Sequence, residues 1–207
     1  MTKIAICGKM ASGKTTMAEW LELNHDYVKF SLAGAVKEFG NFLFDIPEGE
    51  KDRLAYQKVG DGARGYLFED VWITTLFRKV ERHCSTPYKT HNIVVDDVRY
   101  KNEVHKLKAD GWVLIKINID DELQLRRLKK TYPNDWKTHA DARAHPSEAE
   151  VDEIDEELFD FIIEAEGGKA EEIIESIFEE AILELAEEEK FDINIANLST
   201  IRNYNRS

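Results

Sequence analysis

Short apolar runs alternate with segments of helical periodicity along most of the chain. Five runs are typical of buried strands, and they cover residues 3–7, 27–32, 92–96, 112–119 and 159–163. Apolar residues recur at helical spacing between the runs, in residues 14–23, 33–44, 101–109, 121–130 and 170–188, and residues 51–83 are mainly helical in pattern. Alternating strands and helices imply a parallel sheet with right-handed crossovers. The pattern therefore predicts an α/β fold of three layers around a five-stranded parallel sheet.

Two segments depart from this alternation. Residues 132–148 are polar and contain two prolines, so we predict an irregular insert there, preceded by a helix with Asp121 as its N-cap. Residues 191–207 form an asparagine-rich tail whose structure the sequence does not decide. The chain has 207 residues, without a long linker or an internal repeat. Since domains of 100–150 residues are commonest and larger ones are frequent, we expect a single domain over residues 1–207.

The charge and cysteine content narrow the partners and the compartment. The net charge is −13, from 28 Lys and Arg against 41 Asp and Glu, which disfavours polymeric nucleic acid because its binding requires phosphate neutralisation. The acid is concentrated in residues 148–189, so a local basic cleft for a small polyanion is still expected. No stretch approaches the roughly 18 apolar residues of a membrane span. With only Cys7 and Cys84 as thiols, we expect a cytoplasmic protein, in the host cytoplasm if a phage encodes it.

A phosphate-binding motif is complete near the N-terminus. Residues 8–15 read Gly-Lys-Met-Ala-Ser-Gly-Lys-Thr and match G-x-x-x-x-G-K-[ST] at every position, between a predicted strand and a predicted helix. Its glycines let successive N–H groups converge on an anion, and the helix N-terminus adds a positive dipole end. We expect Lys14 to reach the β- and γ-phosphates of ATP and Thr15 to ligate Mg²⁺. The remaining predicted nucleotide contacts are Gly8, Lys9, Ala11, Ser12, Gly13 and Thr16.

Two carboxylates and an arginine follow the third predicted strand. A carboxylate at the end of a neighbouring strand commonly helps to hold Mg²⁺ in P-loop proteins, so Asp96 is our predicted metal residue, with Asp97 beside it. Either carboxylate is also suited to be the N-cap of the helix that begins near Arg99. Arg99 lies at the carboxyl edge, where open α/β sheets bind their ligands, and its guanidinium is suited to hold a phosphate with two hydrogen bonds.

Several longer motifs accompany the phosphate loop. The most specific is Asp-Val-Arg-Tyr-Lys-Asn-Glu at residues 97–103, and His-Pro-Ser-Glu follows at residues 145–148. The set also includes residues 30–37, the elements Gln57–Gly60, Arg64 and Asp70–Trp72, and residues 160–163 with Gly167-Gly168. Together these motifs resemble the phage-type deoxynucleoside monophosphate kinases, within the nucleoside monophosphate kinase group. The resemblance covers about residues 3–180, and Glu164 departs from it because related kinases usually carry Asn there.

The resemblance implies an acceptor-binding region at residues 33–83 and a lid at residues 124–148. Its lid arginines are expected to stabilise the charge of the transferring phosphoryl group, which makes Arg126 and Arg127 catalytic candidates, although consecutive helical residues cannot both point inward. The predicted substrate contacts are Lys37, Arg64, Trp72, Asp97, Arg99 and Arg143. Trp72 and Tyr66 are candidates for stacking on the base, although aromatic residues at helical spacing more often belong to a core.

The sequence thus predicts ATP- and Mg²⁺-dependent phosphorylation of a (deoxy)nucleoside 5′-monophosphate to the diphosphate. One alternative is another small-molecule P-loop kinase, such as a phosphomevalonate kinase or a dephospho-coenzyme A kinase. Another is a nucleotide-binding regulatory protein, although the sequence contains no guanine-reading N-K-x-D. The sequence does not decide the base, the sugar, or whether the chain is a monomer or a homodimer.

Overall fold

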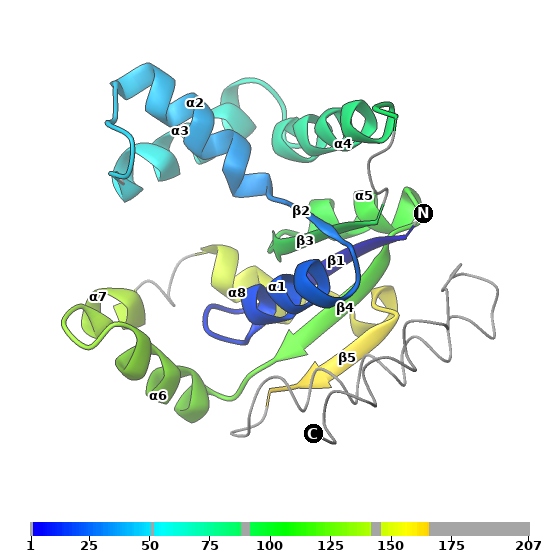
Figure 1. Cartoon of the computed structure of the whole chain (residues 1–207). Coiled ribbons are helices and arrows are strands. Elements are labelled where there is room, and N and C mark those ends of the chain that lie inside the picture. The colour runs from blue at the N-terminus through cyan, green and yellow to red at the C-terminus, as the bar shows by residue number, and fades with distance from the viewer. Residues whose placement is uncertain (1, 51, 88–91, 142–145, 166–207) are drawn as a thin grey trace, which may run out of the picture.

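The computed structural model describes residues 2–50, 52–87, 92–141 and 146–165, and the structural statements below concern these residues. Five strands form one sheet in the order β2-β3-β1-β4-β5, and every neighbouring pair is parallel (Figure 1). The strands are β1 (Lys3–Gly8), β2 (Val28–Phe30), β3 (Ile93–Val98), β4 (Val113–Asn118) and β5 (Phe161–Glu164). The predicted five-stranded parallel sheet is confirmed.

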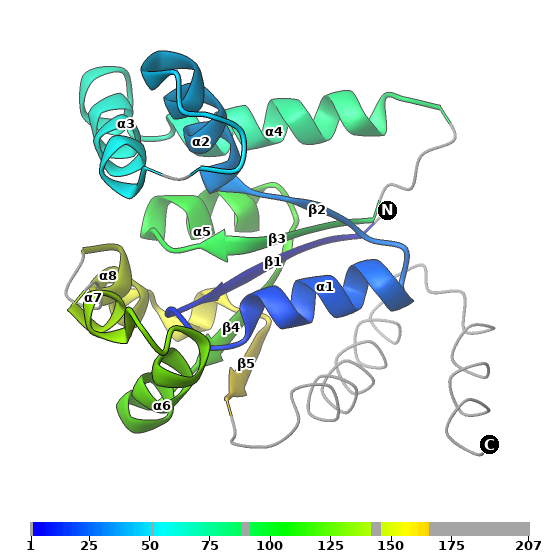
Figure 2. The ribbon, with the colours of Figure 1, turned by 60° about the vertical axis from the view of Figure 1, so that its left-hand side comes forward.

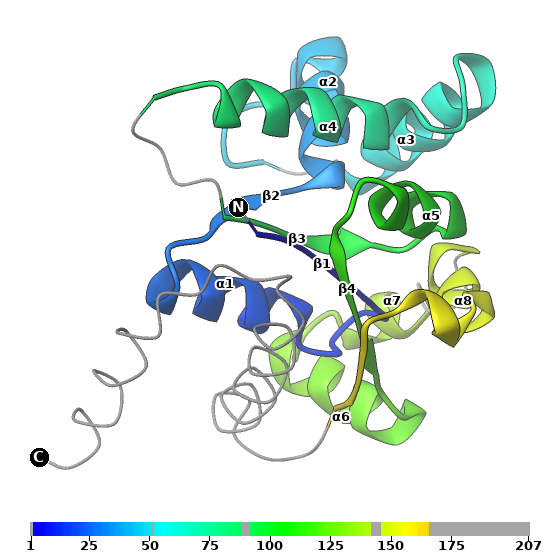
Figure 3. The ribbon, with the colours of Figure 1, turned by 90° about the vertical axis from the view of Figure 1, so that its right-hand side faces the viewer.

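The central strand β1 divides the core into two halves. Ile4 and Ile6 belong to a buried cluster with Met17 of α1 (Lys14–Asn24), whereas Ala5 and Cys7 belong to a second cluster on the other face. Successive strand residues point to opposite faces of a sheet, so this alternation explains why β1 is buried on both sides. Figure 3 shows α1 on one side of the sheet and α5 on the other. The three predicted layers are confirmed.

The remaining helices lie around the sheet (Figure 2). They are α2 (Leu32–Phe44), α3 (Arg53–Tyr66), α4 (Val71–Cys84), α5 (Lys101–Ala109), α6 (Asp121–Thr131), α7 (Trp136–Asp141), α8 (Pro146–Glu153) and the 3₁₀ helix η2 (Glu156–Leu158). Figure 2 shows α2, α3 and α4 on one side of the sheet and α6 and α7 on the opposite side. Among the described helices, none is long and apolar enough to span a membrane.

Side-chain caps fix where several of these helices begin. Ser31 accepts a hydrogen bond from the Gly34 N–H at 2.8 Å at the start of α2, and Asp120 accepts one from the Leu123 N–H at 2.8 Å at the start of α6. The prediction that Asp121 caps α6 is therefore wrong by one residue. Asp120 has the extended backbone of an N-cap, and Asp121 is already helical.

The described part of the predicted irregular insert is largely helical. Residues 132–148 contain α7 and the start of α8, and Val151 of α8, with Ile154 just after it, is buried in the same cluster as Ala5. Helical periodicity is weak in this part of the sequence because α7 has only six residues and α8 has few apolar positions. Helix α8 therefore packs against the core. The predicted helix at 170–188, the Gly167-Gly168 turn and the tail lie outside the described residues.

Candidate phosphate-binding and acceptor site

The loop between β1 and α1 has a backbone that only glycine allows at two positions. A Cβ on Gly8 would lie 2.6 Å from the carbonyl oxygen of Ile117 in β4, too close for any side chain. Gly13 has φ of 114°, in the left-handed region, and directly precedes α1. The two glycines of the sequence motif are thus required by close approach and by backbone conformation. The loop has the geometry of an anion cradle at a helix N-terminus.

Lys14 is buried and folded back onto this loop. Its Nζ donates to the Lys9 carbonyl oxygen at 2.5 Å and lies 3.5 Å from the Ser12 hydroxyl. Burial, followed by the nearby positive charge of Arg99, lowers the pKa of Lys14 to about 8. A phosphate in the cradle would offer this ammonium a charged acceptor, which forms a stronger hydrogen bond than a carbonyl does.

The predicted metal residues lie on two sides of the loop. Thr15 is exposed in the first turn of α1, next to Thr16, and Asp96 is buried in β3 with one oxygen 2.9 Å from Lys29 Nζ. Asp96 lies in β3, which pairs with β1, the strand that leads into the loop. Its charge raises the pKa of Lys14, against the larger lowering by burial and by Arg99. No group of three or more acidic, His or Cys side chains suited to a metal occurs among the described residues. Mg²⁺ at this site would therefore need oxygen ligands from phosphate and water in addition to any from Thr15 and Asp96, as Mg²⁺ usually does.

Asp97 caps a helix, but a different one from the helix that the sequence suggested. Its Oδ1 accepts from the Leu32 N–H at 2.9 Å, and its Oδ2 accepts from the Ala33 N–H at 2.8 Å and from the Ser31 hydroxyl at 2.6 Å. The carboxylate thus ties the end of β3 to the start of α2, about 65 residues earlier in the chain. The predicted cap on the helix near Arg99 is wrong, because Tyr100 is the N-cap of α5 and the Glu103 carboxylate accepts from the N–H groups that precede the helix.

The two neighbouring arginines of α6 point in different directions. Arg127 Nη1 donates to the carbonyl oxygens of Ala11 at 3.1 Å and Ser12 at 2.9 Å, so its guanidinium lies on the phosphate loop. Arg126 is exposed. This agrees with the expectation that consecutive helical residues cannot both face inward, and it identifies Arg127 as the one beside the loop.

A buried carboxylate connects Arg99 to the phosphate loop. Its Nη1 donates to Oε1 of Glu148 in α8, whose other oxygen accepts from the Met10 N–H of the loop at 2.7 Å. The side chain of Glu148 is 3% exposed, whereas that of Arg99 is 30% exposed. Arg99 thus retains accessible surface while Nη1 of its guanidinium is held by Glu148.

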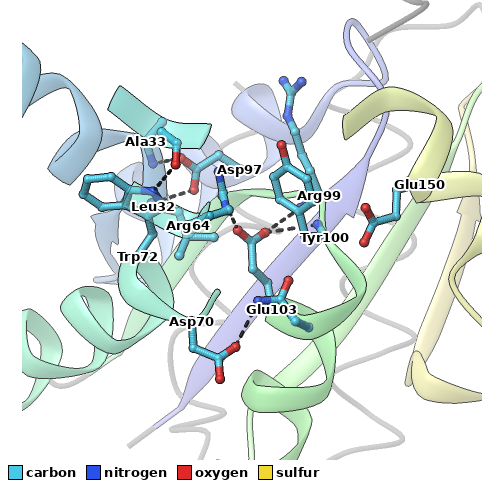
Figure 4. Close-up of polar contacts among 12 residues, drawn as sticks. Leu32, Ala33, Arg64, Asp70, Trp72, Asp97, Arg99, Tyr100, Glu103 and Glu150 are labelled. Atoms are coloured by element: carbon cyan, nitrogen blue, oxygen red, sulfur yellow. Dashed lines mark hydrogen bonds and ion pairs between the residues drawn. The ribbon is translucent and has the colours of Figure 1, made fainter. Parts of the chain in front are cut away.

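Glu103 joins Arg64, the second arginine predicted to contact the acceptor, to the same segment. Its Oε2 accepts from the backbone N–H groups of Arg99 at 3.0 Å and Tyr100 at 3.1 Å, and its Oε1 accepts from Arg64 Nη2 at 3.0 Å (Figure 4). The Arg64 guanidinium also lies 4.1 Å from the centre of the Tyr100 ring. Burial raises the pKa of Glu103. One buried carboxylate therefore positions Arg64 against the backbone at Arg99.

The remaining predicted contacts are spread more widely. Lys37 is exposed on α2, and Tyr66 is 93% exposed at the end of α3. Trp72 is 6% exposed, and its Nε1 donates to the Gly60 carbonyl oxygen at 3.0 Å, which favours the core interpretation over stacking on a base. Arg143 lies outside the described residues.

Three residues at the site were not predicted from the sequence. Glu103 and Glu148 belong to motifs but had no assigned role, and Gln124 was only the boundary of the lid. Gln124 is buried in α6, and its Nε2 donates to the Met10 carbonyl oxygen at 2.9 Å. The spacing Tyr100-x-x-Glu103 has the acidic residue of a capping box, which is a usable signal for Glu103. For Gln124 and Glu148 the contacts are 114 and 138 residues apart, and no local pattern indicates them.

Comparison with known proteins defines the fold but no family. No protein-family model matches the chain, and no curated protein has a significantly similar sequence. A gluconokinase from Sinorhizobium meliloti matches with a TM-score of 0.54 and 14% identity, over 90% of this chain and 94% of that one. A shikimate kinase from Acinetobacter baumannii matches with a TM-score of 0.52 and 14% identity, over 89% of this chain and 94% of that one. TT1252 from Thermus thermophilus matches with a TM-score of 0.53 and 19% identity, over 89% of this chain and 97% of that one. The chain thus has the three-layer fold of P-loop kinases.

Proposed function

We propose that this protein transfers the γ-phosphoryl group of ATP, with Mg²⁺, to the phosphate of a (deoxy)nucleoside monophosphate. The observation that supports this proposal best is the placement of Arg99. It lies beyond the carboxyl end of β3, next to the strand that leads into the phosphate loop, and it is linked to that loop through Glu148. An arginine there is suited to hold an anionic acceptor beside the donor phosphates.

The donor part of the proposal is supported by the cradle itself. The loop geometry fits a polyphosphate, with Lys14 and the backbone N–H groups as its ligands and Arg127 beside Ala11 and Ser12. Thr15 and Asp96 would hold Mg²⁺, which would neutralise charge between the phosphates. An anionic acceptor needs no dedicated general base, because positioning and charge neutralisation account for most of the catalysis in phosphoryl transfer.

The acceptor part is supported by a second arginine. Arg64 comes from α3, within residues 33–83, which we propose as the acceptor-binding region, and Glu103 holds it against the segment of Arg99. Residues 124–148 are our proposed lid, with α6 placing Arg127 on the phosphate loop. A neutral acceptor would not need two arginines whose side chains are 21% and 30% exposed at this edge.

A coupled assay of ADP formation tests the proposal. The protein is incubated with MgATP and each ribo- and deoxyribonucleoside monophosphate in turn. Phosphomevalonate, dephospho-coenzyme A, shikimate and gluconate are included because kinases of such small molecules share the motif or the fold. We expect turnover with one or more nucleoside monophosphates and none with the others. Turnover restricted to shikimate or gluconate, which carry no phosphate, would contradict an acceptor held by Arg99 and Arg64.

A further inference from the structure

A single buried carboxylate joins the two halves of the site. Glu148 accepts from the Met10 N–H with Oε2 and from Arg99 Nη1 with Oε1. Met10 belongs to the phosphate loop, and Arg99 follows β3 on the acceptor side. The two partners come from separate segments of the chain, 138 and 49 residues from Glu148. The two oxygens of one side chain therefore connect the donor half of the site to the acceptor half.

We propose that Glu148 is a positioning residue that sets the distance and orientation between the phosphate loop and the acceptor arginine Arg99. This inference rests on the proposed function, because it assigns Arg99 to the acceptor. Glu148 itself touches neither substrate. Its role is to hold one edge of the Arg99 guanidinium so that the other N–H groups face the acceptor phosphate.

The burial of Glu148 makes both contacts necessary. A carboxylate that is 3% exposed has lost nearly all of its water, which is costly unless hydrogen bonds and opposite charge compensate. Arg99 supplies the opposite charge and Met10 supplies a backbone donor. Loss of either partner would leave a buried oxygen unsatisfied, so the pair resists independent movement of the loop and of Arg99.

Further contacts hold the elements around Glu148 in this arrangement. Helix α8 is anchored in the core by Val151 and by Ile154 at its end, and one turn after Glu148 the Asp152 carboxylate lies 2.6 Å from Lys9 Nζ. The Met10 peptide is held from its other side, because Gln124 Nε2 donates to its carbonyl oxygen at 2.9 Å. A carboxylate on a rigid helix can orient its partners, whereas one on a loose segment would follow them.

The variant Glu148→Gln separates positioning from packing. Glutamine keeps the volume, but its amide has one accepting oxygen, so it cannot accept from Met10 and Arg99 with both terminal atoms. The matched control is Glu150→Gln on the same helix, which changes the same charge. Glu150 accepts from the backbone N–H of Lys101 at 2.8 Å, in an exposed hydrogen bond.

The measured quantities are kcat and KM for the acceptor, the Kd of ATP, and the melting temperature of each variant. We expect Glu148→Gln to lower kcat by about 10- to 100-fold, since misplacement of the reacting groups costs rate without abolishing binding. ATP affinity should stay within about threefold, and Glu150→Gln should stay within about twofold of wild type in kcat. In an Arg99→Ala background, Glu148→Gln should lower kcat by no more than about twofold, because the residues act as one unit.

Three results would overturn the inference. They are equal kcat values for Glu148→Gln and Glu150→Gln, fully additive losses in the double variant, or a loss confined to ATP affinity. If Glu148→Gln does not fold, Arg99→Lys provides the second test, because a lysine cannot bind a carboxylate and a phosphate as a planar fork. Its kcat should fall about tenfold or more, and wild-type kcat would also overturn the inference. The wild-type enzyme distinguishes failure of this inference from failure of the proposed function. If it binds ATP but phosphorylates no nucleoside monophosphate, the proposed function itself fails.

Discussion

The proposed donor side and the proposed acceptor side of the site are built in different ways. The phosphate loop is one continuous segment whose cradle consists of backbone groups, with glycines where β4 approaches and where α1 begins. The acceptor side is assembled from side chains of α3, the segment after β3, α5 and α8, and its central contacts join residues 39 and 49 positions apart. The donor side is thus determined locally, whereas the acceptor side exists only in the folded chain.

This difference predicts how the two sides respond to substitution. A change in the loop should remove a ligand of the nucleotide and leave the core intact. A change on the acceptor side should alter buried charge as well as binding, because Glu103 and Glu148 are buried and hold arginines. The two sides can therefore be separated by measuring ATP affinity, acceptor kinetics and melting temperature on the same preparations.

The largest effect is expected for Lys14→Ala on the donor side. Transfer activity should fall by at least about 1,000-fold, because the ammonium that would neutralise the transferring phosphates is lost. The melting temperature should change little. Burial lowers the pKa of Lys14 to about 8, so the folded protein holds the charged amine less readily than the unfolded chain does. A coupled assay and a thermal melt measure both quantities, and a folded variant with wild-type turnover would refute the assignment.

Among the variants, Thr15→Ala should have the next largest effect, and it is compared with removal of the metal. A chelator should abolish transfer, and Thr15→Ala should weaken it and raise the Mg²⁺ concentration needed for half-maximal rate, since its hydroxyl is the expected ligand. The neighbouring exposed Thr16 gives the matched control, Thr16→Ala, whose Mg²⁺ requirement should stay closer to wild type. Titration of Mg²⁺ against rate gives the comparison. Full activity in the presence of chelator would exclude the proposed chemistry.

Arg99→Ala should damage acceptor use more than ATP binding. The loss of two charge-assisted hydrogen bonds, worth about 1.5–3 kcal/mol each, should lower acceptor kcat/KM at least about tenfold. The melting temperature should also fall, because Glu148 loses its partner while it remains buried. ATP affinity should stay within about threefold, since the loop and Lys14 supply that site.

The control for Arg99→Ala is Arg78→Ala, which removes an exposed arginine of α4. It should leave both the kinetics and the melting temperature close to wild type. Equal losses for ATP and acceptor in Arg99→Ala would mean that Arg99 only braces the sheet edge. Unchanged acceptor kinetics would remove Arg99 from the acceptor site.

The same contrast explains how much could be predicted from the sequence. The five strands, the three layers and the phosphate loop follow from local patterns, and the structure confirms the strands and the layers. The cap of Asp97 was assigned to the wrong helix, because its partners Ser31, Leu32 and Ala33 lie far away in the chain. Helix α8 was missed because it has few apolar residues, and with it the role of Glu148 was missed. Tertiary contacts of single polar side chains leave no periodic signal.

Arg127→Ala and Arg126→Ala form a matched pair on the donor side. The two residues are adjacent in α6, and Arg127 contacts the loop through the carbonyl oxygens of Ala11 and Ser12, whereas Arg126 is exposed. Arg127→Ala should lower kcat by about tenfold, which corresponds to about one charge-assisted hydrogen bond to the transferring phosphoryl group. Arg126→Ala should stay within about twofold of wild type in this conformation. The larger loss in Arg126→Ala would mean that lid closure rotates α6 and exchanges the two guanidinium groups.

The smallest kinetic effect is expected for Trp72→Phe, which tests whether the acceptor side contains a stacking residue. Trp72 is 6% exposed and donates to the Gly60 carbonyl oxygen at 3.0 Å, so it belongs to the core beneath α3. Phenylalanine would leave that oxygen without its donor and a small cavity beside it, at a cost of about 1–3 kcal/mol. The melting temperature should fall by about 2–4 °C for each kcal/mol lost in a chain of this length. Acceptor KM should stay within about twofold, because the packing of α3 is retained.

If Trp72 instead stacked on the base, Trp72→Ala would raise acceptor KM by about tenfold, as loss of base stacking typically costs about 1–3 kcal/mol. Tyr66→Ala would test Tyr66, the competing, exposed candidate, in the same way. A large rise in acceptor KM in Trp72 variants that remain folded would move this residue from the core to the acceptor site.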